Sequence, residues 1–255
     1  MKTLNLKTAL LGAVMTVGTI ALASTAMADK KSDPNNKERM YEVTITNTTL
    51  GQPVAPSVFA THKEGFQLFE LGSAPMPGES GYDDYFALAV MAETGYPFHV
   101  LDQVSASEGV WEAVALLTDR MPPVLLPGES NSTVISATGT AKYLSAVGML
   151  GATNDAIYAL RGTALPRGIG DTTRVFAYAY DAGSEANEES RDTIGALGAP
   201  TDGDDPVSGA GINTNGEGYI HIHAGIHGIG GMDGLSAATH DWRGPVVELT
   251  IERIE

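Results

Sequence analysis

Three acidic residues follow candidate strands and could together bind a metal ion. Asp155 ends the segment 153–155, between two candidate strands, and Asp181 and Glu185 lie in residues 180–188, directly after a strong one. Calcium prefers six to eight oxygen ligands, several of them carboxylates. Loops at one end of a β-sandwich can bring the three carboxylates together, where a cation would offset their repulsion. The residues alone leave a second interpretation open, in which these are ordinary turn acids of an acidic protein.

Four of the six histidines lie within twenty positions near the C-terminus. His221 and His223 are two residues apart on a candidate strand and therefore point to one face, while His227 and His240 follow in loops. Imidazoles in this arrangement could hold zinc or copper, in a metal-binding protein or a metalloenzyme. The competing interpretation is a polar face whose imidazoles hydrogen-bond to backbone groups or carboxylates.

A third acidic stretch joins residues 202–205 (DGDD) and 213–217 (NTNGE). Its composition is typical of calcium loops, but it lacks the ordered D-x-D-x-D-G…E spacing of an EF-hand, which favours a solvated loop. The surrounding segment, 198–218, is rich in Gly, Asp, Asn and Pro and is longer than an ordinary connection. Such loops are usually functional or disordered.

The sequence contains none of the common catalytic signatures. It has no G-x-S-x-G elbow, no H-E-x-x-H zinc helix, no P-loop and no dinucleotide-binding fingerprint after a strand. A Ser–His–Asp set can be chosen on paper, but only convergence in space would support it. We therefore expect a binding protein rather than an enzyme.

Charge and cysteine content restrict the partners and the chemistry. The chain has 15 basic and 31 acidic residues, a net charge of −16, and no cysteine. Such a surface repels nucleic-acid phosphates and anionic lipid headgroups and attracts cations. The absence of cysteine excludes disulfides, thiolate metal sites and a cysteine nucleophile. Nucleic acid is therefore not expected as a partner.

The N-terminal residues predict export. Lys2 and Lys7 precede an uncharged apolar stretch, residues 9–22, and the small residues that follow end in Ala26-Met27-Ala28. These are the three parts of a signal peptide, with cleavage after Ala28. The alternative is an uncleaved anchor, but the apolar run is short for a membrane span. No later stretch could cross a bilayer, so we expect a periplasmic or secreted protein without stable membrane insertion.

Residues 40–255 are predicted to form one domain, after a flexible polar linker at 29–39. Apolar residues alternate with polar ones in residues 41–46 and 247–251, so both ends of the domain are strands that could pair with each other. With 30 glycines and 13 prolines supplying turns, this pattern predicts a mostly β fold, an antiparallel β-sandwich. The other candidate strands are residues 67–71, 133–137, 142–150, 156–160, 174–180 and 218–224.

A small helical insertion interrupts the strands. Tyr82, Tyr85, Phe86, Ala89 and Val90 follow the spacing of one helix face, with Ser80 as a candidate N-cap. A second, weaker helix is predicted within residues 108–118. We expect this insertion to cover one edge or end of the sandwich.

Several segments, taken in order, resemble bacterial spondin-domain proteins, which are similar to the N-terminal spondin domain of animal F-spondin and mindin. The resemblance extends over about residues 40–254, and D-A-G-S-E and the opening strand with its G-Q-P turn are its most specific parts. The segments are residues 41–47 (YEVTITN), 50–53 (LGQP), 56–62 (PSVFATH), 153–155 (TND), 180–187 (YDAGSEAN) and 240–245 (HDWRGP).

The resemblance implies a β-sandwich with a calcium site at one end and a role in adhesion. Asp155, Asp181 and Glu185 match the acidic positions associated with the cation, although Glu185 stands where animal members tend to have Asp. The animal proteins carry further repeat domains and cysteines, which this chain lacks, so their integrin and matrix partners do not transfer. We expect an exported, non-catalytic calcium-binding module that recognises a protein or glycan.

Overall fold

The computed structural model describes residues 21–22, 37–74, 87–197 and 215–255. Over these residues the fold is mostly antiparallel β with a small helical part, as the sequence predicts. The elements are β1 (Ala21–Leu22), β2 (Arg39–Asn47), β3 (Ser57–His62), α1 (Ala87–Thr94), α2 (Phe98–Ala106), β4 (Val110–Leu116), β5 (Ser130–Ala137), β6 (Tyr143–Met149), β7 (Ala156–Ala164), β8 (Thr172–Asp181), η2 (Gly195–Leu197), β9 (His221–Ile222), α3 (Ala237–His240) and β10 (Val247–Arg253).

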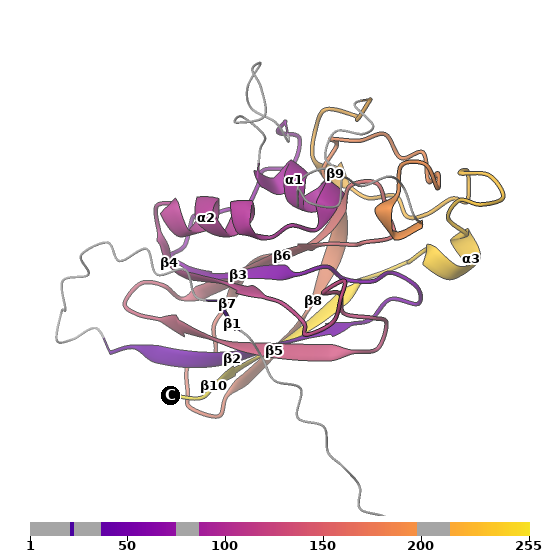
Figure 1. The fold of residues 1–255 in the computed structure, drawn as a ribbon. Coiled ribbons are helices and arrows are strands. Elements are labelled where there is room, and N and C mark those ends of the chain that lie inside the picture. Colours follow the sequence, from indigo (N-terminus) through magenta and orange to yellow (C-terminus); the bar gives the residue numbers. More distant parts are fainter. Residues whose placement is uncertain (1–20, 23–36, 75–86, 198–214) are drawn as a thin grey trace, which may run out of the picture.

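The strands form two layers that are continuous through β8 (Figure 1). The strand order is β1-β4-β3-β6-β7-β8-β10-β2-β5, and β9 pairs with β8. Residues 172–177 of β8 pair with β10, whereas residues 178–181 pair with β7. The N-terminal half of β8 thus belongs to one layer and its C-terminal half to the other, so the end of β8 is fixed at the rim of the sandwich.

The first and last long strands pair along their length, which confirms the predicted pairing of the domain's ends. β2 and β10 are antiparallel in unbroken register, from Tyr41 opposite Arg253 to Asn47 opposite Val247. The alternation read from the sequence matches the burial, because Tyr41, Val43 and Ile45 face inward. These two strands close the layer that also contains β5.

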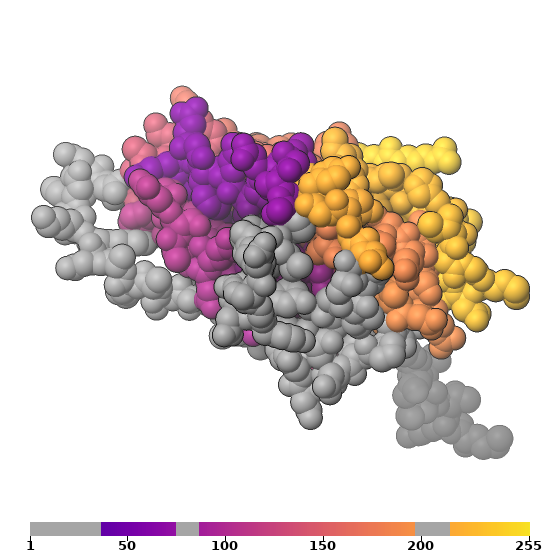
Figure 2. Space-filling view, turned by 90° about the horizontal axis from the view of Figure 1, so that it is seen from above, coloured from indigo at the N-terminus to yellow at the C-terminus, as the bar shows by residue number. Residues whose placement is uncertain are grey.

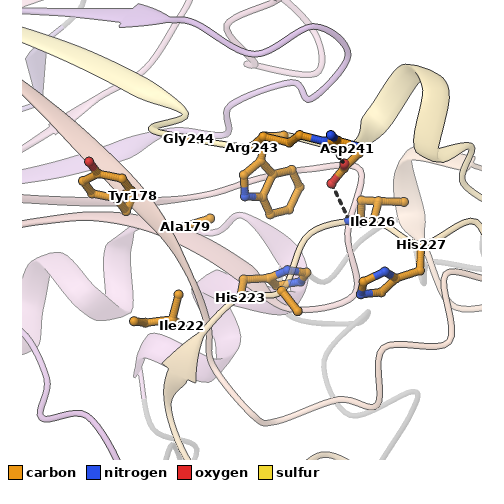
Figure 3. A pocket seen from close by; sticks show the side chains of 11 residues that line it. Tyr178, Ala179, Ile222, His223, Ile226, His227, Asp241, Arg243 and Gly244 are labelled. Atoms are coloured by element: carbon orange, nitrogen blue, oxygen red, sulfur yellow. Dashed lines mark hydrogen bonds and ion pairs between the residues drawn. The ribbon is translucent and has the colours of Figure 1, made fainter.

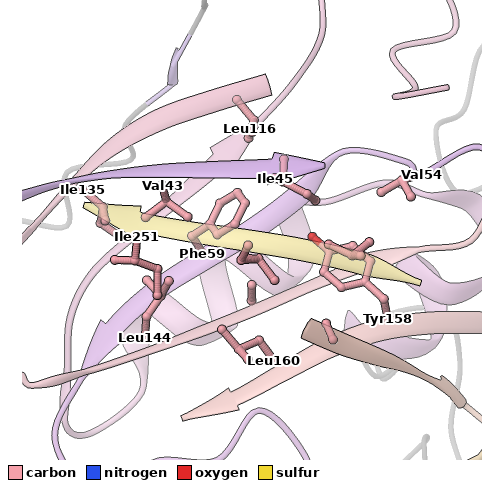
Figure 4. Packing of buried hydrophobic residues seen from close by; sticks show 14 of the residues in the cluster. Val43, Ile45, Val54, Phe59, Leu116, Ile135, Leu144, Tyr158, Leu160 and Ile251 are labelled. Carbon is pink, nitrogen blue, oxygen red and sulfur yellow. The ribbon is translucent and has the colours of Figure 1, made fainter. Parts of the chain in front are cut away.

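The main hydrophobic core lies between the two layers (Figure 4). Val43, Ile45 and Ile135 come from the layer of β2 and β5, and Phe59 and Tyr158 come from β3 and β7 opposite. All five are buried to within 2% of their surface. Without disulfides, this core is the principal source of stability, since burying apolar surface contributes about 25 cal/mol per Å².

Helices α1 and α2 cover the outer face of the layer that contains β3, β4, β6 and β7 (Figure 1). A second core forms there, in which Met91 and Leu101 pack against Val58, Val147 and other strand residues. The prediction that the insertion lies at an edge or end of the sandwich is therefore wrong. The strands under the helices are buried on both faces.

This two-sided burial also explains the errors in element prediction. Residues 108–118 were expected to be helical, but Val110–Leu116 is strand β4, and strand β3 was not predicted from the pattern. Strands buried on both faces lack the alternation of polar and apolar residues. In residues 67–71 the structure has no strand, and in 218–224 only His221–Ile222 is one.

Several predicted features lie outside the described residues. They are residues 1–20 and 23–36 of the N-terminal regions, Ser80, Tyr82, Tyr85 and Phe86 of the insertion, and residues 198–214 of the long loop. Within the predicted signal peptide, Ala21–Leu22 pairs with β4, and β2 begins at Arg39, the last residue of the predicted linker. Among the helices in the described ranges, none has the length and apolar character needed to cross a membrane.

The two faces of β5 provide a direct test of this arrangement. Ile135 is fully buried between the layers, whereas its neighbour Val134 is 43% exposed. We expect Ile135→Ala to lower the free energy of unfolding by about 2–5 kcal/mol, because it leaves a cavity in the core. Val134→Ala should cost under about 1 kcal/mol. Urea denaturation of both variants measures this, and equal losses would contradict the assigned faces.

Candidate functional site

Three connecting segments meet at the rim of the sandwich where β8 ends. They are the turn between β6 and β7, the loop that follows β8, and the C-terminal segment before α3. The loop after β8 and the segment before α3 lie side by side in Figures 1 and 2. A small apolar cluster anchors them, consisting of Ala152, Ile194, Ile226 and Leu235. The loops are therefore packed against one another and can hold side chains in fixed positions.

The turn between β6 and β7 uses each side chain of Thr153-Asn154-Asp155. The Thr153 hydroxyl donates to the Leu150 carbonyl and accepts from the N–H of Ala156, which closes the turn. The Asn154 amide donates to Thr193 and accepts the N–H of Glu189, which ties the turn to the loop after β8. The turn thus directs Asp155 toward the start of that loop.

Asp155 is fully buried, and its two carboxylate oxygens have different surroundings. Oδ2 accepts the N–H groups of Ser184 and Glu185 at 2.7 and 3.0 Å and the Ser184 hydroxyl at 3.2 Å. No described residue forms a hydrogen bond with Oδ1. A buried polar atom without a partner is costly in a folded protein, so Oδ1 requires an explanation.

Asp181 is the last residue of β8 and lies opposite Ala156 in the β7–β8 pair. Ala156 directly follows Asp155 in the chain, so the pairing brings the two aspartates close together. Its Oδ1 accepts the N–H of Gly183 at 2.8 Å, and its Oδ2 accepts the Asn187 amide at 2.6 Å. Gly183 has φ +71° and a Cβ there would lie 2.3 Å from the Tyr219 carbonyl oxygen, so only glycine fits. The D-A-G motif therefore fixes the Asp181 carboxylate and admits the segment around residue 219.

Burial and mutual repulsion disfavour the charged forms of both acids. Burial raises the pKa of Asp155 to about 7, with the nearby charge of Asp181 acting in the same direction. Burial also raises the pKa of Asp181, against the hydrogen bond from Asn187. In both cases the hydrogen bonds to the carboxylate are outweighed. The pair therefore needs a neutralising partner, either a proton or a cation, as the pH approaches 7.

A third carboxylate, Glu217, acts on both aspartates. Its negative charge contributes to the raised pKa of Asp155 and of Asp181, and its Oε1 lies 3.4 Å from the Asn187 amide nitrogen. The sequence placed Glu217 in a solvated loop, apart from this site. Glu185 is buried, and its backbone N–H binds Asp155. The structure thus brings Asp155 and Asp181 together as predicted and adds Glu217.

Two of the four histidines that the sequence treated as a separate site, His221 and His223, lie near the same acid. Nδ1 of His221 lies 3.8 Å from Oδ1 of Asp181, and Nε2 of His223 lies 3.9 Å from Oδ2. The two histidines therefore share a face, as their spacing predicts. Over the described ranges, no three His, Asp or Glu side chains are close enough together to form a complete metal site.

The hydrogen bonding of His223 does not favour zinc or copper. Nδ1 of the buried His223 accepts the N–H of Gly225 at 3.0 Å, so in the neutral ring Nε2 carries the proton and has no lone pair to give a metal. Metal-binding histidines usually donate through their second nitrogen instead. Nδ1 of His221 instead lies 3.2 Å from the Tyr219 carbonyl oxygen, and Nδ1 of His240 lies near both the N–H and the carbonyl oxygen of Ser236, so these contacts do not fix which nitrogen of either ring is protonated. Burial lowers the pKa of His223 to about 4, which keeps it neutral.

A pocket of about 500 Å³ adjoins this cluster (Figure 3). Tyr178 and Ile222 lie toward one end of it, and His227 and Asp241 lie toward the other. The ring of His223 contributes to its wall, with its centroid 5.0 Å from that of Trp242. His223 therefore contacts both Asp181 and the pocket. The sequence offered no signal for this pocket, because its walls come from segments far apart in the chain.

Glu189 connects the loop after β8 to the C-terminal segment. Its buried carboxylate accepts the N–H groups of His227, Gly228 and Ile229 at 2.5–2.9 Å. The residue adopts φ +54°, which is unfavourable for a non-glycine, and its carbonyl accepts the N–H of Leu235. The sequence did not single out Glu189, since nothing in its neighbourhood distinguishes it from surface acids such as Glu188.

The side chains of Ser145 and His62 form a Ser–His pair away from these loops. Nε2 of His62 lies 2.9 Å from the Ser145 hydroxyl, and Nδ1 contacts the Lys63 carbonyl. Both side chains are buried to within 1% of their surface, so a substrate cannot reach the hydroxyl. Burial lowers the pKa of His62. This pair is a contact of the strands and not a nucleophilic site.

No protein-family model matches the chain, and a search of curated proteins finds no significant match. The buried aspartate pair and the adjoining pocket are therefore interpreted from their own geometry and chemistry.

The raised pKa of Asp155 predicts a pH dependence of stability in chelator. Because the folded chain binds this proton more tightly than the unfolded one, the stabilisation is complete below about pH 3.8 and is lost as the pH rises to about 7. The lowered pKa of His223 has the opposite effect on stability, because the unfolded chain binds this proton more tightly and the folded chain loses stability as the pH falls from about 6.5 to about 4. Urea denaturation from pH 4 to 8 should show a smaller loss toward pH 7 in Asp155→Asn than in the wild type. Identical pH profiles would contradict this assignment.

Glu189 should stabilise the loops through its carboxylate. Glu189→Gln replaces one oxygen with a donor that faces backbone N–H groups, so we expect a loss of about 1–3 kcal/mol in unfolding free energy. Glu188→Gln makes the same change at the exposed neighbouring residue and should have little effect. Chemical denaturation compares the two, and equal stability would show that the Glu189 hydrogen bonds contribute nothing net.

Proposed function

We propose that the chain is an exported, calcium-binding β-sandwich module that serves adhesion or recognition and is not an enzyme. The observation that carries the proposal is the buried pair Asp155 and Asp181, in which Oδ1 of Asp155 has no partner among the described residues. A divalent cation bound there would supply that partner and offset the repulsion that raises both pKa values.

The residues present fit calcium better than other metals. Asp155 and Asp181 would hold the ion, Glu217 is a further carboxylate whose charge acts on both, and Glu185 remains a candidate. These groups offer only oxygen, which calcium prefers, and backbone carbonyls and water complete its usual six to eight ligands. When bound, calcium would supply positive charge that links the three loops at the rim.

The rigidity of these loops connects calcium to recognition. Asp155 binds the backbone of residues 184–185, and Asp181 binds Gly183 and, through Asn187, approaches Glu217. Neutralising the carboxylates would stabilise the contacts between these segments, and with them the surface formed by the loops. A protein or glycan would then meet a fixed surface, with less entropy lost on binding.

The resemblance to spondin domains supports the same function. The matching segments T-N-D and Y-D-A-G-S-E-A-N are those that form the acidic pair, and H-D-W-R-G-P supplies Asp241 and Trp242 of the adjoining pocket. The predicted signal peptide at residues 1–28 supports export to the periplasm or the medium, where such a module would act.

The test is the thermal unfolding midpoint in chelator and in excess calcium. Calcium that binds only the folded chain stabilises it by about 2.7 kcal/mol at a hundredfold excess over the dissociation constant. Asp181→Asn should therefore lower the midpoint in calcium but not in chelator. Asp102→Asn, which removes the same charge from an exposed position on α2, should preserve the calcium response.

Equal losses for Asp181→Asn in both conditions would show that the side chain acts only through its hydrogen bonds. An unfolding midpoint that rises with zinc and not with calcium would instead assign the metal site to His221, His223, His227 and His240.

A further inference from the structure

The pocket beside the acidic pair has one wall of exposed large side chains, one aromatic and one aliphatic. Tyr178 is 55% exposed at the end of β8, and Ile222, across the β8–β9 pair, is 67% exposed. Large side chains left in water on a rim of packed loops are typical of binding surfaces. The volume of about 500 Å³ is within the range of small-ligand sites, about 300–1,000 Å³.

The opposite wall is polar and held in place. Oδ1 of Asp241 accepts the N–H of Ile226 at 3.0 Å, which leaves Oδ2 to a contact of 3.9 Å with Nε of Arg243. The Arg243 side chain is 94% exposed and lines the pocket. Trp242, between them in sequence, packs against two apolar clusters and the ring of His223. The wall thus offers both an acceptor and donors from an anchored segment.

The charges of the pocket favour a neutral ligand. Arg243 and Asp241, the oppositely charged side chains of the lining, offset each other. The protein as a whole carries −16 and repels anions. A ligand that fits these walls has an apolar face for the aromatic rings and hydroxyls that both donate and accept hydrogen bonds. A pyranose ring has this combination.

We propose that the pocket lined by Tyr178, Trp242, Asp241 and Arg243 binds a short neutral oligosaccharide. The sugar ring stacks on the aromatic side chains, and its hydroxyls donate to Asp241 and accept from Arg243. The inference rests on the recognition role proposed above and names its ligand, but it does not depend on calcium, because none of these four residues belongs to the acidic pair.

The experiment uses the purified protein on immobilised oligosaccharides of two to four residues. Neutral hexose and N-acetylhexosamine glycans are compared with sialylated and uronic-acid glycans and with unrelated peptides, each in calcium and in chelator. A neutral glycan that binds is then titrated against variants. Tyr178→Ala and Arg243→Ala should each weaken binding about tenfold, without a change in the unfolding midpoint.

Phe176→Ala is the matched control. Phe176 is 47% exposed on the same strand, two residues from Tyr178 and on the same face, but it does not line the pocket. Its loss should leave the affinity within about twofold. Absence of neutral-glycan binding, preference for acidic glycans or peptides, or equal effects of Tyr178→Ala and Phe176→Ala would each overturn the proposal.

These measurements distinguish a failure of the calcium-site proposal from a failure of the oligosaccharide proposal. Neutral-glycan binding that persists in chelator, with no stabilisation by calcium, would leave the pocket in place and overturn the calcium site. Stabilisation by calcium without neutral-glycan binding would do the reverse.

Discussion

The rim of this protein is organised around a carboxylate that is buried where water cannot solvate it. Asp155 uses one oxygen to hold the backbone of Ser184 and Glu185, and its other oxygen has no partner among the described residues. Its neighbour Asp181 is also buried, and the charges of the two acids oppose each other. Because burying like charges together is costly, the arrangement is stable only when a proton or a cation shares it.

The sandwich brings these acids together through β8. This strand passes from the layer of β10 to the layer of β7, and Asp181 is its last residue. The turn that carries Asp155 leads directly into β7, so the pairing of β7 with β8 fixes the distance between the two carboxylates. The same end of β8 carries Tyr178, one residue of the adjoining pocket. One strand crossing between layers thus positions both candidate sites.

His223 is the residue through which the two sites meet. Its Nε2 lies 3.9 Å from Asp181, and its ring contacts Trp242 in the pocket wall. His221 and His223, which the sequence assigned to a metal site separate from the acids, lie in one cluster with Asp181. The N–H of Gly225 donates to Nδ1 of His223 and holds the ring between Asp181 and Trp242.

The alternating strands and the acidic pair could be predicted from the sequence. β2 and β10 each have one buried face, so their alternation and pairing were visible, and Asp155 and Asp181 follow strands that were recognised. β4 was mistaken for a helix because both of its faces are covered, one by α2 and the other by the second layer. Glu189, Glu217 and the pocket could not be assigned, since their roles depend on contacts between loops that only the folded chain brings together.

The most direct test of the account is a calorimetric titration of the purified chain with calcium at pH 7.5, after treatment with chelator. We expect saturable binding of one ion, with release of protons because the raised pKa of Asp155 leaves it partly protonated before the ion binds. Proton release is measured by repeating the titration in buffers of different ionisation enthalpy. No saturable binding, or binding unchanged in Asp155→Asn, would contradict the assignment of the buried pair to a cation.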